Sequence, residues 1–237
     1  MRSFFTFLKV LLFPSLVAAN STVLADEAQD RKARSIAILQ EEGVKYTDHL
    51  PVIETTGTSL RRTEEEVVRR MIALAIVAVK GETGDHAMSQ ALVRQFRAKG
   101  YFSPAEQAFI DNPEPSEHDR NQLTWRYESV HVLLWALGIY DELGKPDTIT
   151  DVPLLAATLR DLGPDGLRKK ARLRPQKEIL DATDLIYRYH WAIVNARVAG
   201  EPAPASLNAS TVYERHYTLN WLIGYMGQDW DDISTDT

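Results

Sequence analysis

An uninterrupted apolar stretch constrains the fold of this chain more than any other feature. Every residue from Met71 to Val79 is apolar, and the stretch follows the acidic segment TEEE at residues 63–66. A threonine three residues before a glutamate is the pattern of a helix-capping box, and acidic side chains favour the positive end of the helix dipole. We therefore predict a helix that begins after Thr63 and ends at Gly81. Because this helix is apolar on every side and far too short to cross a membrane, we expect it in the centre of the core.

Helical spacing of apolar residues recurs along most of the remaining chain. Capping patterns and Gly or Pro stops delimit further predicted helices over residues 26–42, 86–99, from 103 onward, 117–142, 151–162, 175–199 and 211–226. Residues 167–174 fit either a helix or an extended segment. No segment alternates apolar and polar residues as a half-buried strand does. The sequence therefore predicts an all-α fold, a single compact multi-helix domain with buried central helices over residues 26–237.

The N-terminal residues predict export. Arg2 and Lys9 supply positive charge, residues 10–19 a short apolar stretch, and residues 23–25 (VLA) the cleavage pattern of a secretory signal peptide. We expect residues 1–25 to be cleaved, which places the mature domain in the periplasm or outside the cell, with no membrane association after cleavage. The alternative is an uncleaved membrane anchor. Cleavage changes the net charge from −6 to −8, and an acidic chain is a poor match for the phosphate backbone of nucleic acids.

The residues and motifs that the chain lacks exclude several kinds of chemistry. It has no cysteine, which excludes disulfides, thiolate metal sites and a cysteine nucleophile. Walker A, dinucleotide-binding, G-x-S-x-G and H-E-x-x-H patterns are absent. The acidic tail offers Asp231, Asp232 and Asp236 for a hard cation, but we favour pairing of these aspartates with arginines or exposure to solvent. We predict no metal and no cofactor.

Two charged residues stand among apolar ones on the predicted helix 117–142. Arg126 falls on one apolar face of this helix and Glu128 on another, roughly 160° away at the helical repeat. The two side chains therefore cannot pair with each other, and a buried charge without a partner is very costly. We infer that Arg126 meets a carboxylate from another helix or from the tail, and that Glu128 meets a cation.

The predicted helices 175–199 and 211–226 repeat this pattern. His190 lies at the edge of an apolar stripe on the first, and Arg215 stands among apolar residues on the second. With two aspartates of the tail, the candidate polar centre consists of Arg126, Glu128, His190, Arg215, Asp231 and Asp232. Three interpretations are open: internal ion pairs that lock helices in register, a ligand-binding or catalytic centre, and side chains that are exposed.

Several segments resemble a known family. They are RSIAILQEEG (34–43), LPVIET (50–55), TEEEVVRRMIALA (63–75), LTWRYESVHVLLWALG (123–138), ILDATDLIYRYHWAIVNAR (179–197), ERHYTLNWLIG (214–224) and WDDISTDT (230–237). They look like those of the bacterial family called domain of unknown function 4272, and the terminal WDDISTDT is quite specific. The resemblance covers nearly the whole mature chain and implies a helical domain of a bacterial protein. It implies no activity, because none is established for the family. Many members are cytoplasmic, so the predicted signal peptide is a departure.

Two functions fit these observations. The first is a non-enzymatic exported helical domain that binds a protein partner in the cell envelope; it rests on predicted export and on the lack of a catalytic pattern. The second is a hydrolase or metal-assisted enzyme, whose site would lie at the centre of the helix bundle and whose general base would be a carboxylate or histidine of the candidate polar centre. A catalytic centre needs an open cleft with free side chains, whereas structural ion pairs are closed and mutually paired.

Overall fold

The computed structural model describes residues 16–237, with side chains from Glu27 onward. Its helices are α1 (Leu16–Glu41), α2 (Glu64–Thr83), α3 (His86–Gln95), α4 (Pro104–Asp111), α5 (Glu117–Thr124), α6 (Arg126–Ala136), α7 (Val152–Lys170), α8 (Gln176–Val198) and α9 (Ala209–Ile223), with the short 3-10 helices η1 (Pro204–Ser206), η2 (Tyr225–Gly227) and η3 (Trp230–Asp232). No residue of the described part belongs to a strand, so the all-α prediction is confirmed. Residues 1–15, most of the predicted signal peptide, lie outside the described residues.

The apolar helix α2 lies at the centre of the fold, as its sequence predicts. Both bonds of the capping box are present, since Thr63 Oγ1 accepts from the Glu66 N–H and the Glu66 carboxylate accepts from the Thr63 N–H. From Met71 to Ala78 no side chain is more than 7% exposed. Five other helices, α3, α4, α5, α6 and α7, pack around α2. The local capping pattern and the apolar run together therefore determine both the start of this helix and its central place.

The predicted end of α2 at Gly81 is wrong. The helix continues to Thr83 and ends at Gly84, whose φ of 66° is the left-handed conformation common after helix ends. Gly81 has a different role, because α5 passes directly over it. A Cβ atom at Gly81 would lie 2.8 Å from the carbonyl oxygen of Arg120. A larger residue at this position would push the two helices apart.

The predicted helix 117–142 is also wrong, because the structure divides it. α5 ends at Thr124, α6 begins at Arg126, and α6 ends at Ala136 rather than at residue 142. The early end of α6 has a local cause in Gly138, whose φ of 62° is left-handed, and a tertiary contact supports it. The backbone N–H groups of Arg172 and Arg174 donate to the carbonyls of Leu137 and Ala136, both at 2.9 Å. The chain after α7 thus satisfies carbonyls at this helix end that would otherwise lack partners.

Several further boundaries differ from the predicted ones. α1 begins at Leu16, inside the predicted signal peptide, and α3 ends at Gln95. α7 extends to Lys170 across a kink at Gly163, whose φ is 58°, and so includes part of the segment left open between helix and extended chain. α9 begins at Ala209, with Asn208 as its cap, and ends at Ile223 rather than at residue 226. The predicted capping box at Ser103, with Pro104 as first helical residue, is confirmed.

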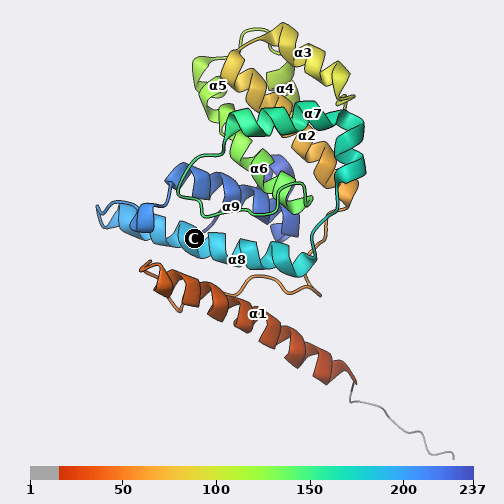
Figure 1. Cartoon of the computed structure of the whole chain (residues 1–237). Coiled ribbons are helices and arrows are strands. Elements are labelled where there is room, and N and C mark those ends of the chain that lie inside the picture. Colours follow the sequence, from red (N-terminus) through yellow and green to blue (C-terminus); the bar gives the residue numbers. More distant parts are fainter. Residues whose placement is uncertain (1–15) are drawn as a thin grey trace, which may run out of the picture.

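The helices form successive layers (Figure 1). α1 packs on α8, α8 on α9, α9 on α6, and α6 on the central α2. Arg31 fastens the outermost layer, because its buried guanidinium lies 3.3 Å from Asp181 of α8. Among residues 16–237, no helix combines the length and the apolar character that crossing a bilayer requires. The α6–α9 interface lies deep in this stack, and it carries the charged residues that the sequence singled out.

Candidate functional site

Two ion pairs cross the interface between α6 and α9. Arg126 Nη1 lies 2.8 Å from Glu214 Oε2, and Arg215 Nε lies 3.3 Å from Glu128 Oε2. Glu128 and Arg215 are only 2% and 3% exposed. The inference that Arg126 meets a carboxylate of another helix and that Glu128 meets a cation is therefore confirmed. Glu214 is the partner that sequence reasoning missed, although its position beside Arg215 on an apolar helix was a usable signal.

The pair Glu128–Arg215 also holds the loop that follows α6. Glu128 Oε1 accepts from the backbone N–H of Thr150 at 2.5 Å, and Arg215 Nη1 donates to the carbonyls of Leu143 and Gly144 at 2.9 and 3.1 Å. Burial raises the pKa of Glu128, while the Thr150 N–H and the Arg215 guanidinium act in the opposite direction. Burial also lowers the pKa of Arg215, so the hydrogen bonds and the opposite charge favour the ionised pair while burial opposes it. The pair therefore positions residues 143–150 against both helices.

The pair Arg126–Glu214 lies beside an aromatic cluster. The guanidinium carbon of Arg126 lies 4.9 Å from the ring centre of Tyr217 and 5.5 Å from that of Trp230. The guanidinium carbon of Arg70, on α2, lies 4.9 Å from the same Trp230 ring. Trp230 is only 4% exposed, and its carbonyl accepts a hydrogen bond from the Tyr217 hydroxyl. Two arginines from different helices thus fix the indole of the C-terminal tail by cation–π contact.

Arg70 has a carboxylate partner of its own in Glu106. This buried pair joins α2 to α4, and Glu106 also closes the capping box at Ser103. The Nε atoms of Arg70 and Arg126 and the Oε1 atom of Glu106 are buried without a hydrogen-bond partner among the described residues. Each of the three side chains is nevertheless paired through another atom. The side chains of these three ion pairs form one polar layer, which consists of Arg70, Glu106, Arg126, Glu214, Glu128 and Arg215. Charge pairing and aromatic rings close this polar layer.

The tail aspartates do not join this layer. Asp231 and Asp232 are exposed, and Asp231 Oδ2 accepts from the backbone N–H of Ala105, at 3.0 Å, in the first turn of α4. Neither forms an ion pair with Arg126 or Arg215 within residues 27–237. In the same part of the chain, no three His, Asp or Glu side chains are grouped so that they could hold a metal ion.

His190 also lies apart from the ion pairs. Its Nδ1 atom lies 2.9 Å from Nδ1 of His216 on α9, so one ring donates a hydrogen bond to the other. Burial lowers the pKa of His190 to about 4 and that of His216 to about 3, so both imidazoles are neutral at pH 7. Arg197 adds to the effect at His190, and His190 adds to the effect at His216. The sequence did not indicate this pairing, because the two residues lie on different helices.

Three of the clefts that adjoin the polar layer have volumes above about 300 Å³. Clefts of about 370 and 420 Å³ lie on the two sides of Trp230 and Asp231. A third cleft, of about 310 Å³, is lined by His190, Tyr213 and Glu214 among others. Of the six predicted residues, the structure brings together Arg126, Glu128 and Arg215, and places His190 and the two tail aspartates at these clefts or beside them.

The model of one protein family matches this chain over residues 31–233, and its description is domain of unknown function, DUF4272. The chain belongs to this family. No curated protein and no solved structure matches the chain significantly. The region that matches DUF4272 contains both ion pairs of the α6–α9 interface and the Trp230 cluster. The predicted signal peptide lies before it.

The DUF4272 domain contains one more buried charge. Lys80, on α2, is fully buried, and its Nζ atom donates to the carbonyls of Phe109, Ile110 and Asn112 at 2.9, 2.8 and 2.6 Å. Burial lowers the pKa of this amine. Lys80 thereby provides hydrogen-bond donors to the carbonyls at the end of α4. The sequence did not indicate this structural role, because the residues next to Lys80 are apolar.

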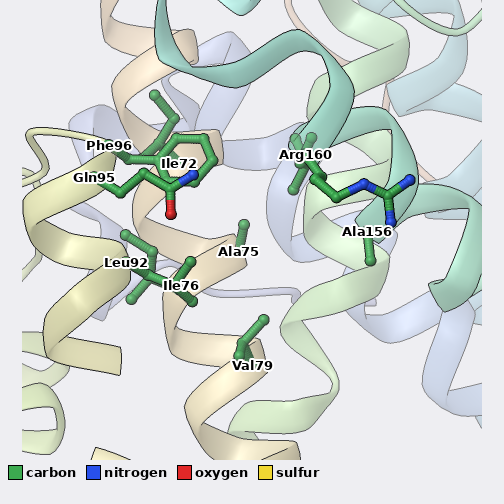
Figure 2. A pocket seen from close by; sticks show the side chains of 10 residues that line it. Ile72, Ala75, Ile76, Val79, Leu92, Gln95, Phe96, Ala156 and Arg160 are labelled. Carbon is green, nitrogen blue, oxygen red and sulfur yellow. The ribbon is translucent and has the colours of Figure 1, made fainter. Parts of the chain in front are cut away.

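A separate apolar hollow lies between α2, α3 and α7 (Figure 2). Its volume is about 210 Å³. Arg160 is the charged residue of its lining, and Gln95 is the uncharged polar one. None of its lining residues takes part in the ion pairs of the α6–α9 interface or in the three clefts around them.

Proposed function

We propose that this DUF4272 protein is an exported bacterial domain that acts by binding a protein partner in the cell envelope, without catalysis. The pairing of Arg126 with Glu214 and of Glu128 with Arg215 supports this function most directly. A general base or nucleophile has to offer a free, correctly protonated group to a substrate. The carboxylates and guanidiniums at the centre of this domain are instead engaged with one another.

The clefts beside Trp230 are the proposed contact surface. Their exposed charged lining residues are mostly acidic, since one exposed cation, Arg69, stands against Glu66, Asp119, Asp229, Asp231 and Asp232. The net charge of the chain is −6. A basic surface on the partner would complement these acidic residues, and electrostatic complementarity raises association rates and selects partners. Trp230, fixed by two arginines, provides a rigid base between the two clefts.

The proposed export explains the charged residues, the apolar stretch and the cleavage pattern in residues 1–25. In this proposal the signal peptide is cleaved after Ala25, and the mature domain is periplasmic or secreted. The contacts of Arg31 and Arg34 with Asp181 hold α1 on α8, and they lie beyond the cleavage point. N-terminal sequencing of the protein from the envelope or medium should therefore begin at Asp26, and a mature chain that begins at Met1 would contradict cleavage.

The test of the binding function is capture from the native envelope fraction with matched charge variants. The protein is expressed from its own N-terminus with an affinity tag, cross-linked and analysed by mass spectrometry. A stoichiometric basic partner is expected, and it should be lost in Asp229→Lys/Asp232→Lys. The control Asp165→Lys/Glu201→Lys reverses two exposed charges outside the clefts and should retain it. Absence of any recurrent partner, or equal loss in both variants, would contradict the proposal.

One observation favours the alternative, a hydrolase or metal-assisted enzyme. His190 is neutral, is held by His216, and lines a cleft of about 310 Å³ together with Glu214. This arrangement supplies a general base with a fixed orientation, although no nucleophile is hydrogen-bonded to it in the described residues. Hydrolysis of p-nitrophenyl acetate that is lost in His190→Gln, with unchanged folding, would support the enzyme. Equal rates in both proteins would contradict it.

A further inference from the structure

The apolar hollow between α2, α3 and α7 has the form of a small-molecule site. Figure 2 shows its floor, which α2 provides through Ile72, Ala75, Ile76 and Val79. Leu92 and Phe96 stand on one side and belong to α3 and its C-terminal end, while Ala156 and Arg160 of α7 stand on the other. Pockets for small molecules are typically concave and mostly apolar, with a few polar groups at fixed positions.

Small residues create the hollow. Ala75 lies in its floor and Ala156 at its side, at a place where α3 and α7 both pack on α2 without filling the space between them. The volume of about 210 Å³ exceeds the ~150 Å³ of an apolar protein cavity that binds benzene. The hollow is therefore large enough for one aromatic ring or for a hydrocarbon chain.

The polar residues of the lining determine which polar group a bound ligand would carry. In Figure 2 the Gln95 amide turns toward the hollow, whereas the Arg160 side chain begins at the opposite edge and extends away from it. No acidic residue lines the hollow. Arg160 Nε lies 2.9 Å from Asp161, but both side chains are largely exposed, so this ion pair restrains the guanidinium only weakly. The guanidinium is thus free to turn toward an anion at the mouth.

We propose that this hollow binds a small carboxylic acid, with the hydrocarbon body on α2 and the carboxylate at Arg160. A body of about eight carbons fits a hollow somewhat larger than a benzene site. This site shares no lining residue with the clefts beside Trp230, so it does not depend on the proposed partner binding.

Calorimetric titration of the purified protein with three probes of equal chain length tests the site. The probes are octanoate, 1-octanol and octylamine. Octanoate should bind most tightly, 1-octanol more weakly, and octylamine at least tenfold more weakly than octanoate. Tightest binding of octylamine, or no binding of octanoate at millimolar concentration, would overturn the proposal.

Matched variants locate the binding. Ala156→Leu places three carbons into the hollow and should weaken octanoate at least tenfold, whereas Ala157→Leu, the adjacent residue outside the lining, should leave it unchanged. Arg160→Met should bring the affinity for octanoate down to about that for 1-octanol, without loss of 1-octanol. Equal effects of the two leucine variants, or an unchanged preference in Arg160→Met, would place the binding elsewhere and overturn the proposal. Partner capture by Ala156→Leu reports separately on the proposed function, because this residue lies outside the acidic clefts.

Discussion

Glu214 and Arg215 are consecutive residues of α9, and they pair with charges of opposite sign on the same neighbouring helix. Glu214 accepts from Arg126 and Arg215 donates to Glu128, so the two ion pairs cross the α6–α9 interface side by side. Buried charges are tolerated when each has a partner and further hydrogen bonds. The interface therefore fixes the register of α6 on α9, since a shift of either helix would separate both pairs.

Arg126→Met should destabilise the fold. The substitution leaves Glu214 in a buried site without its cation and removes the guanidinium from Tyr217 and Trp230. Loss of one partner of a buried pair costs about 3–5 kcal/mol, measurable by urea unfolding. Arg69→Met is the control, because Arg69 pairs with Glu65 on the surface, where a pair contributes about 1 kcal/mol or less. Equal, small effects of both substitutions would show that the Arg126 pair is not buried in solution.

Acid should destabilise the protein through the His190–His216 pair. The folded-state pKa values are lowered to about 4 and about 3 by burial, whereas an unfolded histidine has a pKa of about 6.5. The unfolded state therefore binds more protons between these values. The free energy of unfolding is therefore not reduced by these histidines above about pH 6.5. Below this pH it decreases by up to about 1.4 kcal/mol per pH unit for each histidine.

The pH dependence has an internal control. In His190→Gln/His216→Gln, the decrease of unfolding free energy between pH 6.5 and pH 4.5 should be smaller than in the unmodified protein. Substitution of the exposed His49 and His118 by Gln should leave the slope unchanged. The same slope in all three proteins would mean that the paired imidazoles are accessible to protons in the folded state.

Lys80→Met should destabilise the contact between α2 and α4. The methionine fills much of the space but cannot donate to the carbonyls of Phe109, Ile110 and Asn112. A buried carbonyl without a donor costs about 1–3 kcal/mol, so a loss of about 3 kcal/mol or more is expected in thermal unfolding. Lys99→Met, on the surface, should change stability by less than about 0.5 kcal/mol.

Trp230→Ala should loosen the C-terminal tail. The indole lies between Arg70 and Arg126 and contacts Tyr217 and Trp221 edge to face. Truncation of a buried tryptophan to alanine costs about 3–5 kcal/mol, and amide hydrogen exchange in residues 228–234 should accelerate. Met226→Ala, at an exposed position of the same segment, is the control and should leave both measurements nearly unchanged. Unchanged exchange in Trp230→Ala would show that other contacts hold the tail.

The parts of the fold that were predicted correctly depend on residues that lie close together in the sequence. The capping boxes at Thr63 and Ser103 and the apolar run of α2 are local patterns, and the structure contains all three. Gly138, whose φ is 62° just after the end of α6, was a local stop signal that the predicted helix 117–142 overlooked. The hydrogen bonds that the Arg172 and Arg174 N–H groups donate to the end of α6 come instead from a distant segment. No helical periodicity within residues 117–142 contains that information.

The same distinction holds for the candidate site. The wheel positions of Arg126 and Glu128 indicated that each needs an opposite charge, and the structure provides one for each. The identity of the partners required the packing of α6 on α9, because a single sequence contains no direct record of which helices meet. His216 and Glu106 were missed for this reason, since their partners lie on other helices.

A double-mutant cycle on Glu128 and Arg215 tests the central claim, that these buried charges satisfy each other across α6 and α9. The free energy of unfolding is measured for the unmodified protein, Glu128→Leu, Arg215→Met and the double variant. If the two side chains are partners, the double variant is more stable than the sum of the single effects predicts, by about 2 kcal/mol. Single effects that add within about 0.5 kcal/mol would contradict the claim.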